Sequence, residues 1–526
     1  MSEPNKENNE SDIFSEPSAS SAKITARTKH KSEAKRQLRA LLIVLAAAIV
    51  GALLYFFVLK PLLAEAPEPP AEEVVLLDGE VLGSQNRIMI MDYIKRDQIA
   101  SIDVHNKYGD WGVYYDEADD EFYVKDAKGA AYDREMLQEL FSAAGYTLSM
   151  ERIAEYTDNF SQFGLSELDA PAWYVISDRE GNSHKLYIGD PIPSNAGYYV
   201  RYDGRDAVYV LDQTIEKTLL APIEALISPL LAVPVSTSTY FQITNMYLLR
   251  NNELVVAMQY LSDEERKQSG TSAIHKFLYP EQYVPNDSKY LSMFEKFTDY
   301  EGMSTLVFKP TAAELADYGL DKPEFDLYFE FSGVPTNIIF SAKNDNGNYY
   351  AYSPLFDIIT EVEAANAEFL EWTLIDWIER PLFLVNINTV RSISVDTAEH
   401  SYEFVLESEN ETLKNVRETV SGKAVDVELF RKFYQTILMT ELQDYTGLDR
   451  SELDALKEAG AYMTLKIRTS DERVREFCFY PYETRRSFYT VNGDGEFYIL
   501  RDRMNKIVSD AGKVLSGEDI VPDANQ

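Results

Sequence analysis

Apolar and polar residues alternate over long stretches of the chain beyond residue 87, which is the pattern of strands with one buried face. The alternation predicts strand pairs in three regions, at residues 102–115 with 122–124, 241–249 with 254–260, and 390–395 with 402–406. After each pair, apolar residues follow at helical spacing. These predicted helices begin at an acid that can accept hydrogen bonds from the free N–H groups of a first turn: Asp133, Asp287 and Asp426.

The three regions are copies of one unit. Pro229-Leu230 matches Pro381-Leu382, 152 residues later, and the alternating apolar positions that follow match in the same register. Each copy then has a Gly-Leu pair, in which glycine readily adopts the left-handed conformation that ends a helical turn. These pairs are Gly164-Leu165, Gly319-Leu320 and Gly447-Leu448.

After the Gly-Leu pair, each copy contains further strands, the last of them aromatic, and a predicted closing helix, near residues 214–227, 354–378 and 501–515. The third copy departs from the pattern by an insertion at 450–460. The repeats predict an α+β fold of three tandem domains, built from antiparallel strands with short helices. Their predicted bounds are 87–237, 238–384 and 385–517, followed by a disordered C-terminus at 518–526.

Residues 40–60 form an apolar run without a charge from Ala40 to Leu59, and this predicts a single transmembrane helix. The basic residues gather before the run, so the positive-inside rule places the N-terminus in the cytoplasm. We therefore expect a disordered basic cytoplasmic tail at 1–39, a Pro/Glu-rich spacer at 61–86 and an extracytoplasmic remainder. A signal anchor explains the long leader better than a cleaved signal peptide, although Ala64-Glu65-Ala66 resembles a cleavage site.

Composition limits the classes of partner. The net charge of −37 is unfavourable for binding nucleic acid, and it keeps a large domain soluble. The only cysteine, Cys478, excludes an intrachain disulfide and lies far from the apolar run, so it cannot carry a lipid there. Small residues at Ala47 and Gly51 have the spacing of a helix–helix contact, which suggests a homodimer through the membrane helix.

No local motif identifies a catalytic, cofactor or metal site, and we expect no cofactor. The five histidines do not pair at ligand spacing, and no phosphate-binding loop or nucleophile elbow occurs. The acidic run at 116–121 and the segment 344–347 lack the ligand pattern of a calcium loop, so both are interpreted as hairpin turns. Paired carboxylates of a glycosidase cannot be tested from sequence in so acidic a chain.

The aromatic strands are the repeated feature with binding potential. Tyr198, Tyr199, Tyr349 and Tyr350 are candidate partner-binding residues, because tyrosine combines apolar area with a hydroxyl group. The structural alternative is that they pack across strand pairs, where tyrosine is favoured.

Several turn and strand signals carry a resemblance to a known family. They are the run 319–323 (Gly-Leu-Asp-Lys-Pro), the strand end 187–190, and the segments 197–200 and 207–210. Together with the N-terminal apolar helix, they make the chain similar to the bacterial domain-of-unknown-function 4340 family. Members are often linked with gliding-motility-type ABC transport systems, so the resemblance implies transporter subunits as partners. It implies no catalytic residue.

These observations predict a single-pass envelope protein without enzymatic activity. Its outer domains are expected to bind or position a partner, as an accessory of an ABC-type transport system. Two alternatives remain: a surface module that binds sugars or peptides of the cell wall, and a wall hydrolase that uses carboxylates.

Overall fold

The computed structural model describes residues 30–55, 57, 74–166, 171–239, 241–331 and 333–521. The predictions for residues 1–29, for 56 and 58–60 of the apolar run, for 61–73 of the spacer and for 522–526 lie outside these residues. The chain divides into two units, Met1–Val75 and Leu76–Gln526.

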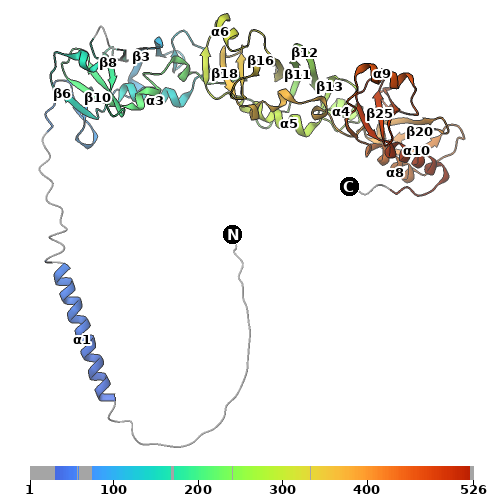
Figure 1. Cartoon of the computed structure of the whole chain (residues 1–526), viewed down its shortest axis with the longest axis horizontal. Coiled ribbons are helices and arrows are strands. Elements are labelled where there is room, and N and C mark those ends of the chain that lie inside the picture. Colours follow the sequence, from blue (N-terminus) through green and yellow to red (C-terminus); the bar gives the residue numbers. More distant parts are fainter. Residues whose placement is uncertain are drawn as a thin grey trace, which may run out of the picture. The chain divides into compact units, whose positions relative to one another are not determined.

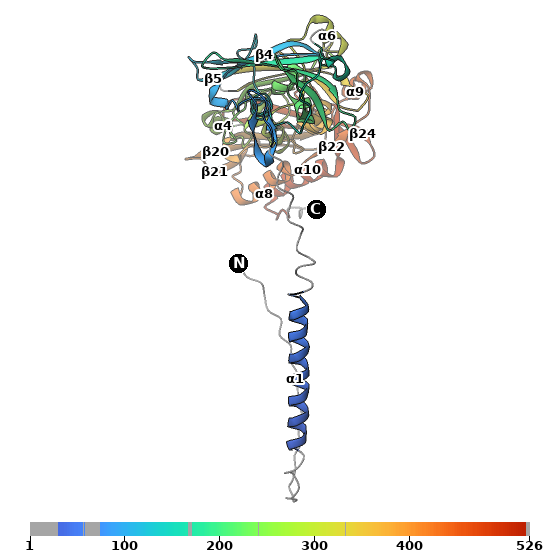
Figure 2. The same ribbon diagram turned by 90° about the vertical axis from the view of Figure 1, so that its left-hand side faces the viewer.

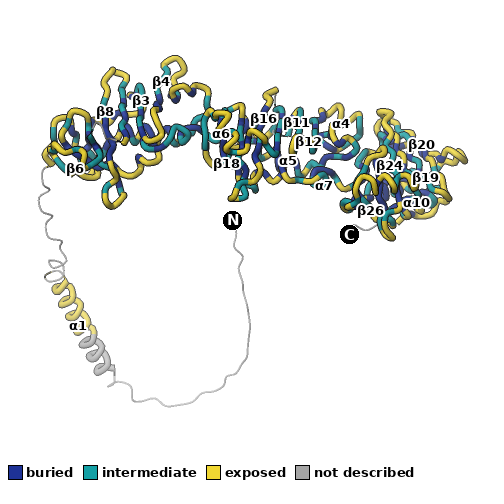
Figure 3. Tube along the Cα trace, turned by 45° about the horizontal axis from the view of Figure 1, so that its top comes forward, coloured by how far each residue is buried: buried dark blue, intermediate teal, exposed yellow. Residues whose placement is uncertain are grey.

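The first unit contains helix α1 (His30–Leu54), which starts in the basic segment and continues into the apolar run. Its residues 41–54 are exposed along their length (Figure 3). In the described part of the chain, no helix is long and apolar enough to cross a membrane.

The second unit opens with the small hairpin of β1 (Val81–Leu82) and β2 (Ile88–Met89), and continues into three antiparallel sheets of eight strands (Figure 1). The first sheet contains β3 (Ile99–Asn106), β4 (Gly109–Asp116), β5 (Glu121–Val124), β6 (Glu151–Ala154), β7 (Ala172–Asp178), β8 (Ser183–Pro191), β9 (Gly197–Tyr202) and β10 (Val208–Asp212). The second contains β11 (Ile243–Arg250), β12 (Glu253–Tyr260), β13 (His275–Tyr279), β14 (Thr305–Phe308), β15 (Phe325–Phe331), β16 (Val334–Lys343), β17 (Tyr349–Ser353) and β18 (Ile358–Val362). The third contains β19 (Val390–Thr397), β20 (Ser401–Glu409), β21 (Thr412–Glu418), β22 (Leu442–Tyr445), β23 (Met463–Thr469), β24 (Val474–Glu483), β25 (Arg486–Val491) and β26 (Phe497–Leu500).

All three sheets share one strand order. In the first sheet it is β5-β4-β3-β7-β8-β9-β10-β6, and the corresponding strands of the second and third sheets follow the same order. The fourth strand of each copy therefore does not pair with the third or the fifth strand, its neighbours in sequence. It pairs with the eighth strand and forms one edge of the sheet. This identity confirms the repeated α+β pattern, and we refer to the copies as the first, second and third repeat.

A helix connects the third and fourth strands of each repeat: α3 (Arg134–Gly145), α5 (Asp287–Lys296) and α8 (Val427–Leu438). The predicted caps at Asp133 and Asp426 are confirmed, since each carboxylate accepts a hydrogen bond from an N–H of the first turn. The prediction for Asp287 is wrong by one residue. Asn286 is the cap, and the Asp287 carboxylate instead accepts from Ile274 N at 3.1 Å.

The Gly-Leu pairs have the expected backbone. Gly164, Gly319 and Gly447 have φ values of 67°, 71° and 74°. The first two follow the short helices η4 (Phe160–Phe163) and α6 (Ala312–Asp317), whereas the third precedes α9 (Arg450–Glu458). The predicted insertion at 450–460 is therefore a helix in the same connection, between the fourth and fifth strands, where η4 and α6 lie in the other repeats.

Only one predicted closing helix is correct, α10 (Arg501–Ser516), which packs beside α8 (Figure 2). In the first repeat the region forms two 3₁₀ helices, η5 (Gln213–Lys217) and η6 (Ile223–Leu226), because Pro222 interrupts a continuous helix. In the second, 354–378 contains strand β18, two 3₁₀ turns and the short α7 (Leu374–Trp377). The β-branched run at 358–360 favours the strand.

Each repeat is preceded by a leader segment that pairs with the connection after its helix. The backbone bonds are equivalent in all three: Ile90 N–Thr147 O (3.0 Å) with Ser149 N–Ile88 O (2.8 Å), Leu231 N–Tyr300 O (2.8 Å) with Gly302 N–Pro229 O (2.9 Å), and Leu382 N–Thr440 O (2.9 Å) with Leu442 N–Arg380 O (2.8 Å). The Pro-Leu match found in the sequence thus marks the linker that docks one repeat onto the next.

The hydrophobic cores also join across the repeats. One cluster runs from Leu231 to Ile520 and includes the core strands of the second and third sheets. The core of the first sheet includes Ile358 of the second repeat, with Phe308 and Phe356 packed against it. Figure 3 shows the buried positions running through the strands of this unit. The three repeats therefore form one compact unit from Leu76 onward.

Candidate functional site

The four candidate tyrosines divide between two sheets and between two faces of each sheet. Tyr198 and Tyr199 lie on β9, and Tyr349 and Tyr350 occupy the corresponding positions of β17. Neighbouring residues of a strand point to opposite faces. Tyr349 is buried in the core of the second repeat, at 1% exposure, so it is a core residue and cannot contact a partner as expected.

The two tyrosines on the opposite face pack against the turn that precedes each Gly-Leu pair. The ring of Tyr199 meets Phe163 at 4.9 Å, and the ring of Tyr350 meets Tyr318 at 4.8 Å. Tyr198, on the core face, donates a hydrogen bond to Glu216, and this bond raises the pKa of Tyr198 to about 12. The structure does not bring the four residues together, and packing accounts for their recurrence.

The acidic run and the calcium-like segment are turns. Lys128 bridges Asp116 (2.6 Å) and Asp119 (2.7 Å), and its hydrogen bonds lower the pKa of both carboxyl groups. The side chain of Asn344 accepts from the backbone N–H of Asn346 and Asn348, which closes the hairpin. Among the residues that the structure describes, no group of three or more His, Cys, Asp or Glu could hold a metal ion.

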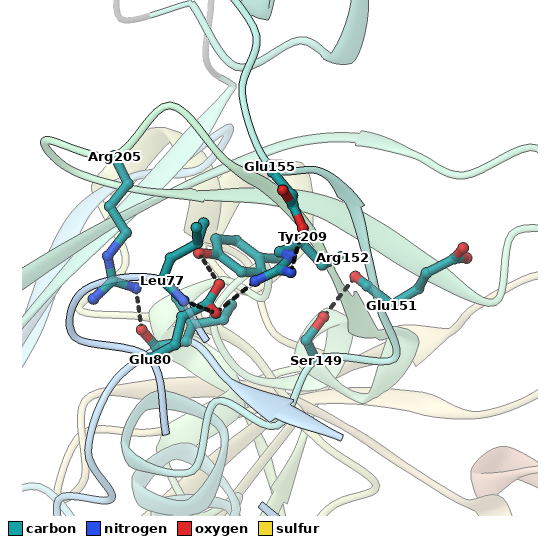
Figure 4. Close-up of polar contacts among 9 residues, drawn as sticks. Leu77, Glu80, Ser149, Glu151, Arg152, Glu155, Arg205 and Tyr209 are labelled. Carbon is teal, nitrogen blue, oxygen red and sulfur yellow. Dashed lines mark hydrogen bonds and ion pairs between the residues drawn. The ribbon is translucent and has the colours of Figure 1, made fainter. Parts of the chain in front are cut away.

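A polar cluster around Glu80 fixes the start of the second unit to the first sheet (Figure 4). The Glu80 carboxylate, fully buried, accepts from Leu77 N at 2.7 Å, from Arg152 Nη1 at 2.6 Å and from Tyr209 Oη at 2.8 Å. Arg152 lies on β6, and Tyr209 lies on β10. Burial, followed by the bond to Glu80, raises the pKa of Tyr209 to about 12. We call this group the Glu80 lock, because it attaches residues 77–80, which lie within the predicted spacer 61–86, to the first sheet.

A cavity that could hold a ligand lies between the second and third repeats. This 2–3 cleft has a volume of about 820 Å³. One wall is strand β13 with its flanking residues between 261 and 285. The other wall is formed by residues 383–385 of the linker and by the ends of β23, β24 and β25 in the third sheet. Strand β13 is an edge strand of its sheet, so one side of its backbone has no strand partner.

Arg475 is the notable side chain of the 2–3 cleft. It is the second residue of β24, and its guanidinium lies 5.9 Å from the centre of the Phe383 ring. The Nη1 atom is buried and has no hydrogen-bond partner. Burial lowers the pKa of Arg475. Its neighbour Arg473, in contrast, is paired with Asp471 at 2.8 Å.

The cleft also contains the buried hydroxyl of Tyr283, which has no hydrogen-bond partner and lies on the wall of the second repeat. His275 lines the same wall from β13 and is surrounded by the rings of Tyr290 (4.9 Å) and Phe294 (5.4 Å). Burial lowers the pKa of His275 to about 4, so its ring is neutral at pH 7. No local sequence pattern indicates this site, because its residues come from two repeats.

The comparison with family models agrees with this repeat structure. Residues 123–300 and 280–457 each match the model described as Domain of unknown function (DUF4340), and together they cover more than half of the chain. The chain belongs to the DUF4340 family. No curated protein and no solved structure matches it.

The DUF4340 matches are displaced from the sheets. Each begins near the helix of one repeat or the strand before it, and ends after the helix region of the next. Each match therefore contains one docked linker, the first at 229–231 and the second at 380–382. The 2–3 cleft falls within or next to the second match, whereas Arg475 lies beyond its end at residue 457.

Proposed function

We propose that this DUF4340 protein is a single-pass, membrane-anchored binding and scaffold protein whose repeats lie outside the cytoplasm. The observation that carries the proposal is the equivalent docking of the three repeats. Each leader segment pairs with the repeat that follows it, and hydrophobic contacts join the second repeat to the first and to the third in one unit, which suits a protein that positions a partner.

The anchor is supported by the exposed apolar face of α1. Leu41, Ile43 and Val44 are each at least 68% exposed, and residues 40–54 carry no charge. Such a contiguous apolar surface is unfavourable in water and favourable in a bilayer. The basic residues that precede it favour a cytoplasmic N-terminus.

An accessory role beside an ABC-type transport system is supported by the family resemblance. The Glu80 lock is consistent with this role, because it attaches the last part of the predicted spacer to the first sheet. A partner that binds the repeats would thereby be held at a defined place relative to the end of the spacer.

A wall hydrolase is less well supported. Burial raises the pKa of Asp287 to about 6 and also raises the pKa of Glu301, Glu379 and Glu496, yet none of these four lines the 2–3 cleft. Of the carboxylates that do line it, Glu265 and Asp471 have lowered pKa values. A general acid in the cleft would need a raised pKa. We therefore propose a binding protein without enzymatic activity.

Two experiments test the proposal. For the anchor, we expect L45R/I49R to move the full chain from the membrane fraction to the soluble one, since each central arginine costs about 2.5–3.5 kcal/mol of insertion free energy. The matched control L45A/I49A should stay with the membrane. For the partner, crosslinking in native membranes should recover a transporter subunit with the parent chain but not with L45R/I49R. Recovery of none would refute the accessory role.

A further inference from the structure

Arg475 differs from the other interior guanidinium groups described in the structure. Arg152 pairs with Glu80, Arg205 donates to Ile90 O, and Arg250 donates to Leu370 O and Trp372 O. Among the residues that the structure describes, the Arg475 Nη1 atom has no hydrogen-bond partner and no acid forms an ion pair with its guanidinium, although the chain carries 87 acidic residues. Leaving a buried charged donor without an acceptor costs free energy, so such a group is expected to have a function.

The surroundings of Arg475 fit an extended chain better than a compact anion. The opposite wall of the cleft is the edge strand β13, and an edge strand can add a further strand through its free N–H and C=O groups. Apolar residues from both walls, including Phe277, Leu278 and Val474, can receive alternate side chains of such a strand. The unpartnered Tyr283 hydroxyl supplies a further polar contact.

The charges that line the cleft also favour a carboxylate over a phosphate as the group bound by Arg475. A guanidinium binds carboxylate and phosphate alike through two parallel hydrogen bonds. The cleft, however, carries four carboxylates, Glu265, Glu281, Asp471 and Asp494, against the three cations Lys276, Arg473 and Arg475. Asp471 is paired with Arg473 at 2.8 Å, and Asp494 is paired with Arg450 at 3.8 Å. The four carboxylates disfavour a dianion, whereas a monoanion can be held by the single unpaired guanidinium.

We propose that the 2–3 cleft binds an extended peptide that adds to the edge of β13 and places a carboxylate on the guanidinium of Arg475. This inference goes beyond the proposed anchoring role and does not depend on it. It can be tested on the detergent-solubilised full chain, without a membrane or a transporter, so its failure is distinguishable from failure of the proposed function.

The test uses fluorescence anisotropy of a fluorescein-labelled pentapeptide of alternating alanine and valine with a free carboxyl terminus. We expect saturable binding that weakens by about 10- to 100-fold when the terminus is amidated, and by a similar factor in R475Q. The control R468Q should bind like the parent, because Arg468 does not line the cleft and pairs with Glu472 outside it. Methylation of alternate backbone amides should also weaken binding, because it removes hydrogen bonds to β13.

Two further arms separate the sources of the anion. An amidated peptide with one central aspartate tests whether a side-chain carboxylate can replace the terminal one in binding to Arg475. Binding of this peptide would support the proposal and would identify a side chain as the source of the carboxylate. Inorganic phosphate should compete poorly, and competition stronger than that of the peptide would overturn the choice of carboxylate.

Stability provides the second measurement. Since Arg475 has no partner, R475M should unfold at the same temperature as the parent or a higher one while losing the peptide. If R475M instead unfolds at a lower temperature and binds the peptide as the parent does, Arg475 is only structural and the proposal fails. Absence of saturable binding by any of the carboxylate peptides would also overturn it.

Discussion

The Glu80 lock allows a graded prediction, because its three hydrogen bonds use both carboxylate oxygens. Oε2 accepts from Leu77 N and Arg152 Nη1, and Oε1 accepts from Tyr209 Oη. In E80Q, the amide oxygen can keep the first two bonds, and the amide nitrogen can donate to the tyrosine hydroxyl. The negative charge is then lost, and the Tyr209 hydroxyl, which donates to Glu80 in the parent, loses the acceptor of its own proton. Charged hydrogen bonds contribute about 1.5–3 kcal/mol and neutral ones about 0.5–1.5, so we expect a loss of about 1–2 kcal/mol.

E80A removes all three acceptors. The Arg152 side chain is only 10% exposed and keeps its bond to Glu155, which is itself 66% exposed. Breaking a buried ion pair by removing one partner costs about 3–5 kcal/mol. E155Q is the matched control on the same arginine, and as a change to an exposed pair it should cost less than about 1 kcal/mol.

Urea unfolding followed by tryptophan fluorescence measures these differences, since Trp111 and Trp173 lie in the first repeat. Limited proteolysis near residues 76–91 should show the same order of susceptibility, E80A above E80Q above E155Q. The double variant E80L/R152M, which replaces the ion pair by apolar groups, should recover most of the stability lost in E80A. If E80A is no less stable than E155Q, the lock does not hold this segment and the reasoning is wrong.

Further predictions concern His275 and the Gly-Leu turns. The pKa of His275 is lowered to about 4 in the folded chain and is about 6.5 in the unfolded chain. The contribution of the neutral ring to the free energy of unfolding is therefore complete above pH 6.5, and it is lost as the pH falls toward 4. As the pH falls from 7.5 to 5, the free energy of unfolding of H275F should therefore rise by about 2 kcal/mol relative to that of the parent. Urea unfolding measures this difference. A difference that does not depend on pH would contradict the lowered pKa of His275. G319A should lower the free energy of unfolding by about 1–2 kcal/mol through its positive φ alone, because the nearest neighbour of the added Cβ would lie 3.8 Å away. G164A should lower it by more, because its Cβ would lie 2.8 Å from Asp190 Cγ. Equal losses of unfolding free energy in the two variants would exclude the contact with Asp190 as a cause.

The sequence predicted those features of the fold that depend on local pattern. Alternation located the strand pairs, and Asp133 and Asp426 cap helices as expected, because a cap depends on residues three positions apart. The cap at Asn286 was missed because the adjacent Asp287 is an equally good candidate, and only the position of Ile274 N decides between them.

Features that depend on distant residues could not be predicted. The strand order requires the fourth strand to cross to the eighth, and alternation contains no information about that choice. The 2–3 cleft joins Tyr283 and Arg475, which are far apart in sequence and share no motif. The candidate tyrosines were chosen because they recur, but recurrence in this chain reflects packing, as the contact of Tyr199 with Phe163 illustrates.

The leader segments show which linker belongs to which repeat. Pro229 and Leu231 hydrogen-bond to residues 300–302 of the second repeat, although the predicted boundary at 237 assigns them to the first. Likewise, Arg380 and Leu382 bond to 440–442 of the third repeat, across the predicted boundary at 384. The first leader, at 88–90, lies within the predicted start of its own repeat. Hydrogen bonding therefore places each leader with the repeat that follows it. Both DUF4340 matches therefore span the passage from one repeat to the next, since the first includes the leader at 229–231 and the second includes the leader at 380–382.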